Sequence, residues 1–434
     1  MTLKYVAEIR DPIHGYIKIT REERDLIDSL FIQRLRRIHQ LAGAYLVYPG
    51  GVHTRFEHVI GTMHVAGLIG QSIANTAGLR DDDIQELRIA ALLHDVGHGP
   101  FSHLFEEVLF ERTDVTHEDL SQRIVTESNI AEILRREGQE PSKISRLCVG
   151  KSGGQPFLNQ VIAGGLSADM MDYLLRDAYF TGVEYGKVDI QRIIDSLDIS
   201  DDGHMMLERA ALYAFEALLI ARYEMFKAVY FHRTVRAAEL MLAHSMNLAD
   251  DELQLTEISR IEKILRLTDE VVLQQLADLS PHSPELKMAK KLALNYMHRK
   301  LVKCVFEKVV QRKDRTIQRI LSKKSFRDEL ASDIARGAAV SPSDIYIDVP
   351  NTPSVPYAYE RRMFKSITLF NNAYEGRKKT ETETITVGEL PLVGSIAGFM
   401  DIIRIYTFSE HRRKVVGAVE TIFGKEDLMS RISI

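Results

Sequence analysis

The segment ALLHDVGHGPFSHLF (residues 91–105) limits the possible folds more than any other part of the chain. An apolar run with helical spacing leads directly into His94 and Asp95, and the glycines and proline of GHGP end that helix. An ionised Asp is costly to bury unless it is paired or coordinates a metal, and the neighbouring imidazole can bind the same cation. Nine of the 15 histidines fall within the first 117 residues, so the sequence predicts a metal or acid–base site in a helical body.

Two further segments carry residues suited to the same site. HTRFEHVIGTMHVAG (53–67) places His58 at the start of a helix whose other positions are mostly apolar or small. LSADMMDYLLRDAYFTG (166–182) places Asp169 in the first turn of a helix, with Tyr173 on the same face. Two imidazoles and two carboxylates suit Mn, Fe, Co, Ni or Zn, with Mg as a further candidate, and leave coordination positions for water or phosphate oxygens.

Helical periodicity dominates residues 21–330, for example in REERDLIDSLFIQRLRRIHQL, and Gly/Pro breaks separate the helices. The run 208–248 contains no Pro or Gly and is predicted to be helical throughout. Further along, prolines become frequent, and two short β-like runs (ETITVGELPLVG and MDIIRIYTF) precede a helix-like HRRKVVGAVETIFG. We therefore expect a mainly α protein, with a helical domain over residues 1–335, its motifs between 50 and 180, and a small mixed α/β region over 336–434.

The composition is that of an ordinary globular protein: 434 residues, 45% hydrophobic and 27% charged, which excludes a disordered or low-complexity chain. The formal charge of −5 disfavours general nucleic-acid binding. The stretch 299–327 carries eleven Lys and Arg against two acidic residues, and is either a solvated helix face or a surface for polyphosphate, nucleic acid or a partner chain. Two separated cysteines, no apolar run of 18 residues and no signal-like N-terminus predict a cytoplasmic protein without a membrane segment.

The segments HDVGHGPFSH and TRFEH, with Asp169 downstream, resemble the HD-superfamily phosphohydrolases. Within that superfamily the chain is most similar to the branch of deoxynucleoside triphosphate (dNTP) triphosphohydrolases, which includes the mammalian enzyme that joins an HD domain to a SAM domain. The resemblance is dense from DPIHGYIKI to residue 186 and thins towards residue 250; we expect no SAM domain, since the HD region begins almost at Met1. It implies a helical HD core and one divalent metal, and allows a second ion alongside the substrate. By this resemblance the metal ligands are His58, His94, Asp95 and Asp169.

A histidine suited to proton transfer lies at the start of another helix. In THEDLSQRIV, Thr116 is the predicted N-cap and Asp119 its capping-box partner, which puts His117 in the first turn. The resemblance implies that His117 is the acid for the departing oxygen and that a carboxylate orients it. The two candidate carboxylates are Glu118 and Glu106.

The resemblance also places residues around a nucleotide substrate. They are His98, His103, Arg55 and Arg222 beside the phosphates, Gln40 and Leu41 along the base and sugar, and Tyr173 and Asp177 under the deoxyribose. One position departs from the family: Met170 stands where the mammalian enzyme has a phosphate-binding Lys. This departure weakens the expectation of triphosphate specificity but leaves the metal site intact.

A regulatory guanine-nucleotide pocket is a further implication of the resemblance. Its residues would be Asp28, Gln33, Arg36, His232 and Arg233. In the family such a pocket lies between subunits, so the resemblance also implies an allosteric homodimer or homotetramer. Alternatively, Asp28 and Arg36 form a surface pair on one helix.

The leading hypothesis is a metal-dependent dNTP triphosphohydrolase that attacks the α-phosphorus and releases deoxynucleoside and triphosphate. The first alternative is an HD-type phosphodiesterase, 5′-nucleotidase or nuclease with the same metal site, which the apolar Met170 favours. The second alternative is a non-enzymatic nucleotide-sensing or nucleic-acid-binding scaffold, which the basic stretch 299–327 favours.

Overall fold

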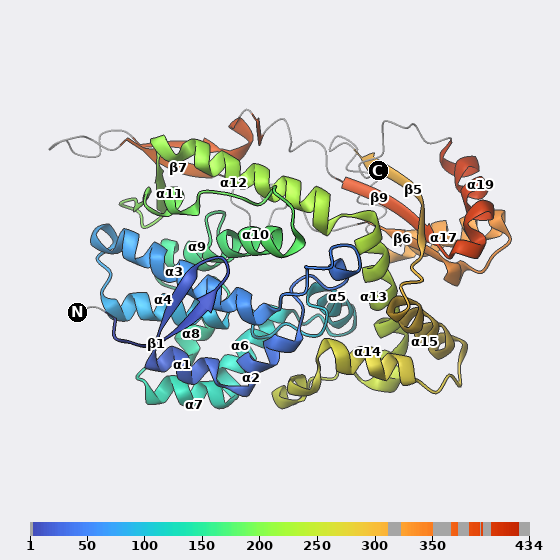
Figure 1. Ribbon diagram of the computed structural model, residues 1–434, viewed down its shortest axis with the longest axis horizontal. Coiled ribbons are helices and arrows are strands. Elements are labelled where there is room, and N and C mark those ends of the chain that lie inside the picture. The colour runs from blue at the N-terminus through green and yellow to red at the C-terminus, as the bar shows by residue number, and fades with distance from the viewer. Residues whose placement is uncertain are drawn as a thin grey trace.

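The computed structural model describes residues 3–310, 323–349, 366–371, 382–390, 392–393 and 401–424. These residues are mainly helical, as the sequence predicts, and two short strands open the chain as a hairpin (Figure 1). In this described part no helix is long and apolar enough to cross a membrane. The elements up to residue 253 are β1 (Tyr5–Asp11), β2 (Gly15–Thr20), α1 (Arg21–Ile27), α2 (Leu30–Arg34), α3 (Arg55–Ala77), α4 (Asp81–Leu93), α5 (His103–Thr113), α6 (His117–Glu127), α7 (Asn129–Arg136), α8 (Pro141–Leu147), α9 (Pro156–Ala163), α10 (Ala168–Thr181), α11 (Ile190–Ile194), β3 (Leu197–Ile199), β4 (Met205–Glu208), α12 (Leu212–Met225) and α13 (Arg233–Leu253).

The centre of the helical body is α3, which packs against α4 on one side and α10 on the other. Its buried residues surround it on nearly all faces, so this helix lies inside the body. Gly61 allows the close approach of α10, because a Cβ at this position would collide with the side chains of Asp172 and Arg176. The first turn of α3, the end of α4 and the first turn of α10 therefore meet at one place.

Two of the predicted helices are interrupted. The expected helix over residues 21–41 divides at Ser29, whose side chain caps α2, because its Oγ accepts a hydrogen bond from the Ile32 N–H. The predicted continuous helix over 208–248 is wrong: α12 passes into a π-helical turn at Phe226–Tyr230, and α13 starts afresh at Arg233. Neither break contains Gly or Pro, so no strong breaker marks them in the sequence.

The remaining described elements lie at the other end of the molecule and along its upper side in Figure 1. They are α14 (Asp269–Asp278), α15 (Pro284–Met297), β5 (Lys303–Val310), α17 (Lys324–Ala338), β6 (Ile345–Asp348), β7 (Ser366–Phe370), β8 (Thr382–Thr386), β9 (Asp401–Thr407) and α19 (Arg412–Phe423). β9 pairs antiparallel with both β5 and β6, and α17 and α19 pack together beside this sheet. The expected mixed α/β character of the C-terminal region is confirmed.

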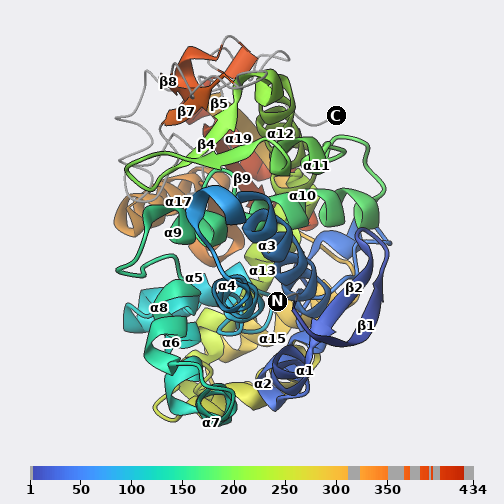
Figure 2. The same cartoon turned by 90° about the vertical axis from the view of Figure 1, so that its left-hand side faces the viewer.

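A second sheet, in the order β3-β4-β7-β8, joins the C-terminal segments to the helical body (Figure 2). β4 pairs parallel with β7, so Met206 lies opposite Thr368. The basic stretch 299–327 is not one helix face: its residues 303–310 form β5, and residues 311–322 lie outside the described residues. Residue 335, the expected domain boundary, lies within α17.

Candidate metal centre and histidine cluster

The four residues predicted as metal ligands converge, although they come from three helices. His58 lies in the first turn of α3, His94 caps the end of α4 with Asp95 after it, and Asp169 lies in the first turn of α10. The Nε2 atom of His58 is 3.1 Å from Asp169 Oδ1 and 3.7 Å from Asp95 Oδ2. The Nε2 atom of His94 is 3.3 Å from Asp95 Oδ1 and 3.8 Å from Asp169 Oδ1. Two nitrogen and two carboxylate donors therefore face one point.

These donors fit a divalent metal. The Nε2 atoms of His58 and His94 are buried and have no hydrogen-bond partner among the described residues. Their Nδ1 atoms are held from behind, by Asp172 Oδ2 at 2.8 Å and by the Ala91 carbonyl at 2.7 Å, which is how proteins orient imidazoles that bind metals. The Asp169 side chain is 37% exposed, so it marks the open side of the centre.

The electrostatics of His58 also favour a cation. Burial disfavours an imidazolium, but Asp169 and Asp172 outweigh burial and raise the pKa of His58 to about 10. Asp169, which would hold a proton on Nε2, could hold a metal ion there instead, while Asp172 stays on Nδ1.

Asp172 is the residue at this centre that the sequence analysis missed. It is fully buried, and its carboxylate lies 2.7 Å from His14 Nε2 while it accepts hydrogen bonds of 2.9 and 2.8 Å from Arg176. Burial opposes ionisation, but Arg176, His14 and His58 hold the pKa of Asp172 well below its ordinary range. The i,i+4 spacing of Asp172 and Arg176 was the available signal.

Arg55 is buried next to the centre. Its guanidinium is 2% exposed, its Nη1 donates to Asp95 Oδ2, and its Nε donates to Ser102 Oγ at 2.7 Å. Arg55 thus orients a metal ligand, and its predicted contact with phosphate stays a prediction.

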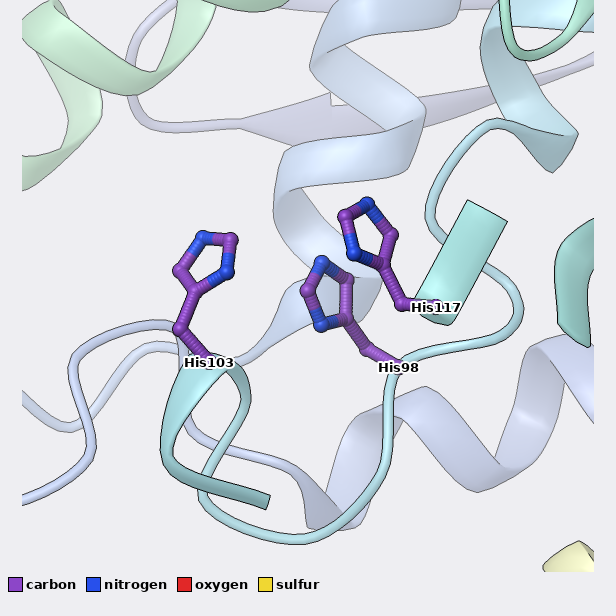
Figure 3. A group of neighbouring side chains, drawn as sticks. All are labelled: His98, His103 and His117. Carbon is purple, nitrogen blue, oxygen red and sulfur yellow. The ribbon is translucent and has the colours of Figure 1, made fainter. Parts of the chain in front are cut away.

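A second group of imidazoles consists of His98, His103 and His117 (Figure 3). The rings of His98 and His117 stack with centroids 3.9 Å apart and planes inclined by 13°, and His103 meets His98 edge-on at 4.8 Å. His98 Nε2 is 3.4 Å from Asp95 Oδ1, so this group touches the metal centre directly. Burial and the nearby Arg55 charge lower the pKa of His98 well below its ordinary range, which keeps that ring neutral.

Glu106 is the carboxylate that orients His117. Its Oε1 lies 2.6 Å from His117 Nδ1, and its Oε2 lies 3.1 Å from His103 Nδ1. Glu118, the other candidate, forms an ion pair of 3.4 Å with Lys151. Burial opposes ionisation of Glu106, but His103 and His117 hold its pKa well below the ordinary value, so the group remains a carboxylate.

The ring geometry favours proton chemistry over a shared metal for this second group. Candidate ligand atoms of His98, His103 and His117 lie within 4.8 Å of one another. However, an imidazole binds a metal about 2 Å from its nitrogen and close to the ring plane. Two parallel rings stacked at 3.9 Å have no such point in common.

Gly97 allows the predicted metal ligands and the cluster of His98, His103 and His117 to lie side by side. A Cβ at this position would collide with the carbonyl oxygen of His117, so the HD segment reaches the start of α6 only with glycine here. Ser121 fixes the contact, since its Oγ accepts from the Gly97 N–H and donates to the His94 carbonyl, each at 2.9 Å. The predicted capping box of Thr116 and Asp119 is confirmed.

Comparison with known proteins agrees with this geometry. The family model for the HD domain matches residues 55–156, and that for the HD associated region matches residues 188–366. A protein of Dictyostelium discoideum named as a deoxynucleoside triphosphate triphosphohydrolase SAMHD1 homolog is 30% identical over 86% of this chain and 73% of its own length. The chain belongs to the HD superfamily of phosphohydrolases.

Other relatives extend the comparison. The SAMHD1 triphosphohydrolase of Bos taurus is 26% identical over 78% of this chain and 64% of its own length. An uncharacterised protein of Methanocaldococcus jannaschii is 34% identical over 62% of the chain, which spans only 57% of that protein's length. A crystal structure of a hypothetical protein from Aquifex aeolicus has a TM-score of 0.74 and 28% identity, covering 95% of this chain and 99% of that one. This HD protein therefore resembles the SAMHD1 branch, and its converging His and Asp side chains could hold a divalent metal.

Tyr173 and Asp177, predicted to lie under a deoxyribose, are on α10 of this HD protein, and Arg222, predicted to lie beside the phosphates, is on α12. The Tyr173 hydroxyl is hydrogen-bonded to Arg222, whose Nη1 also lies 3.9 Å from Met170 Sδ. Asp177 accepts a hydrogen bond of 2.6 Å from the Tyr230 hydroxyl, and its other oxygen is 2.8 Å from His53 Nε2. Neither Tyr230 nor His53 was predicted. They were missed because the spacing of these residues in the sequence does not show that either contacts Asp177.

Gln40 and Leu41 are both half-buried, and Gln40 has a buried Oε1 without a hydrogen-bond partner among the described residues. Such an amide oxygen is costly to leave unpaired. A ligand with an N–H or O–H donor would satisfy it.

The residues predicted for a regulatory pocket fall in two places. Asp28 is the exposed C-cap of α1, while Arg36 donates to Gln33 Oε1 at 2.9 Å and lies 3.5 Å from the centre of the Phe56 ring. His232 is the N-cap of α13 and Arg233 is its first residue. The i,i+8 pair on one helix is excluded, because α1 ends at Ile27 and Arg36 lies beyond the end of α2.

Proposed function

We propose that this HD enzyme hydrolyses dNTPs to a deoxynucleoside and inorganic triphosphate. The observation that carries the proposal is the Glu106–His117 pair, which stands directly beside the four converging metal ligands. The names of the Dictyostelium discoideum and Bos taurus relatives support dNTPs as the substrate class.

The metal, when bound by His58, His94, Asp95 and Asp169, would supply a Lewis acid to the phosphoryl oxygens. His117 donates a proton from Nε2 to the departing 5′-oxygen, as water forms a bond to the α-phosphorus and the bond to that oxygen breaks. The proton that the attacking water loses passes to solvent. Glu106 on Nδ1 stabilises the charged imidazole before the transfer.

The nucleoside end would lie along α10 and the turn after α12. The Tyr173 ring would pack under the deoxyribose, and Asp177, held by Tyr230, would accept a hydrogen bond from the 3′-hydroxyl. Arg222 lies against Met170, the position that lacks the family Lys, so its guanidinium supplies positive charge at that point.

Product analysis tests this proposal. Purified protein loaded with Mn²⁺ or Mg²⁺ is incubated with each dNTP, and the products are separated by anion-exchange chromatography. Deoxynucleoside and tripolyphosphate in equal amounts would support the proposal. Pyrophosphate or orthophosphate would contradict it, and the Asp95→Ala variant controls for contaminating phosphatases.

A second function has one observation in its favour. Met170 is 3% exposed and apolar, which suits a substrate with fewer phosphate charges, such as a phosphodiester or a nucleoside monophosphate. Cleavage of bis(p-nitrophenyl) phosphate or dAMP without tripolyphosphate release from dNTPs would establish it.

The proposal includes a regulatory guanine-nucleotide site only if the protein is an oligomer. Because the resemblance to the family places such a pocket between subunits, a guanine nucleotide that touched Arg36 and His232 would join two copies. Sedimentation velocity with and without GTP tests this. A dimer or tetramer that GTP stabilises, with faster dNTP turnover, would support it, and a GTP-insensitive monomer would contradict it.

A further inference from the structure

The chain takes an unusual backbone conformation between His98 and His103. Phe101 and Ser102 have φ angles of 57° and 59°, and neither is glycine. Residues with a Cβ adopt this left-handed region at an energetic cost, so surrounding contacts must hold it. Both residues are buried, at 3% and 2% exposure.

The contact that holds this turn comes from the HD associated region. Asp269 is the first residue of α14 and is 4% exposed. Its Oδ1 accepts a hydrogen bond of 2.7 Å from the Phe101 N–H. Its Oδ2 accepts one of 2.9 Å from the His39 N–H and lies 2.7 Å from His39 Nδ1. One carboxylate thus joins the turn to the segment that contains Gln40.

A chain of hydrogen bonds leads from this turn to the metal centre. Ser102 Oγ donates to the His39 carbonyl and accepts from Arg55 Nε, each at 2.7 Å. Arg55 in turn donates through Nη1 to Asp95. The position of Ser102 therefore sets the orientation of the guanidinium that holds a metal ligand.

Arg34 makes a second connection between the same regions. Its Nη2 donates to the carbonyls of Val96 and His98, at 3.0 and 2.6 Å, and its Nη1 donates to the carbonyl of Leu267 at 3.1 Å. Asp269 and Arg34 thus connect the loop after His94 and Asp95 to residues 267–269 at two places. Neither residue belongs to the HDVGHGPFSH motif.

We propose that Asp269 is a positioning residue of the metal centre, acting through the Phe101–Ser102 turn and Arg55 on Asp95. This assigns a function to part of the HD associated region: it keeps a strained loop of the HD domain in the conformation that binds metal. The inference concerns metal binding, so it holds for any substrate of the HD centre.

The test uses full-length protein loaded with Co²⁺, which reports ligand geometry through its visible d–d absorption. The variants are Asp269→Asn, Ser102→Ala and their combination, and release of Co²⁺ to excess chelator is followed by stopped-flow absorption. Loss of a partner that orients a metal ligand typically costs 10- to 100-fold in metal affinity. We expect each single variant to release Co²⁺ about 10-fold faster, with an altered d–d spectrum.

The double variant distinguishes a shared pathway from general damage. If Asp269 acts through Ser102, the combination is no worse than the more severe single variant. Asp278→Asn is the matched control, because Asp278 lies at the far end of α14 and is hydrogen-bonded to the exposed Gln274; its Co²⁺ release should equal that of the wild type.

Three results would overturn the proposal. They are wild-type release and spectrum in Asp269→Asn, additive effects in the double variant, and an equal effect of Asp278→Asn. Thermal unfolding establishes that each variant is folded. If Asp269→Asn does not fold, the test rests on Ser102→Ala. A wild-type rate of Co²⁺ release from Ser102→Ala would then refute the proposed pathway.

Discussion

The metal centre and the histidine cluster use the same device for different chemistry. In both, a carboxylate or carbonyl holds an imidazole at Nδ1 and leaves Nε2 available, as Asp172 does for His58 and Glu106 does for His117. In the metal centre the free nitrogens and two carboxylates converge, whereas the rings of His98 and His117 stack. Converging donor atoms suit a cation, whereas two stacked rings share no common ligand point, so each can exchange only its own proton. The arrangement of equivalent side chains, and not their type, separates the two proposed functions.

The largest expected effect tests the metal side of this comparison. Asp95→Ala should remove both bound metal and turnover, because it deletes a ligand and leaves the buried Arg55 charge unpaired. Metal content by elemental analysis and turnover of dNTPs are measured on the same preparation. Asp201→Ala, at an exposed position, is the control. Full metal occupancy in Asp95→Ala would show that the donors do not form one centre.

The next effect tests the proton-transfer side. His117→Ala should keep the metal but lower kcat by about 10²- to 10⁴-fold, the usual contribution of a general acid. Elemental analysis and kcat again separate the two functions. Loss of metal in this variant would mean that the histidine cluster does bind an ion, and a wild-type kcat would remove His117 from the mechanism.

Glu106→Gln should give a smaller effect, since it removes a positioning group. A fall in kcat of about 10- to 100-fold is expected, as for other partners of functional imidazoles. The wild-type carboxylate stays ionised in acid because His103 and His117 depress its pKa, so acidic pH should not reproduce the effect of the variant. Bound metal should stay at the wild-type level, and an unchanged kcat would contradict this role.

His103→Ala should have the smallest effect. The His103 side chain is 69% exposed, and its hydrogen bond to Glu106 is worth little in water. We expect kcat to change by less than about tenfold, in line with the net value of one such hydrogen bond. A loss as large as that of His117→Ala, measured under the same conditions, would place His103 in direct contact with the reacting groups.

Local patterns in the sequence place His94 and Asp95 at the end of one helix and His58 at the start of another, as the structure has them in α4 and α3. Their selection as metal ligands, together with Asp169, rests on the resemblance to the HD superfamily and stays a prediction. Asp269 and Arg34 were missed because their partners are more than 60 residues away, so no local pattern shows what these buried charges pair with. Asp172 has a local partner in Arg176, but its contact with His58 also spans more than 60 residues.

The prediction of secondary structure was wrong in two places for the same reason. The basic segment that became β5 is extended because it pairs with β9, almost a hundred residues further along the chain. The π-helical turn at Phe226–Tyr230 places Tyr230 against Asp177, a contact that helical periodicity cannot foresee. Tertiary pairing overrides local preference at both positions.

The parallel pairing of β4 with β7 limits how this protein can be shortened. β4 follows directly from the helical body, whereas β7 begins only at Ser366. A polypeptide that ended near residue 335 would leave the N–H and C=O groups along one side of β4 without their neighbour, and such groups recruit strands from other molecules. We therefore expect truncation there to cause self-association, even though every metal ligand would be retained.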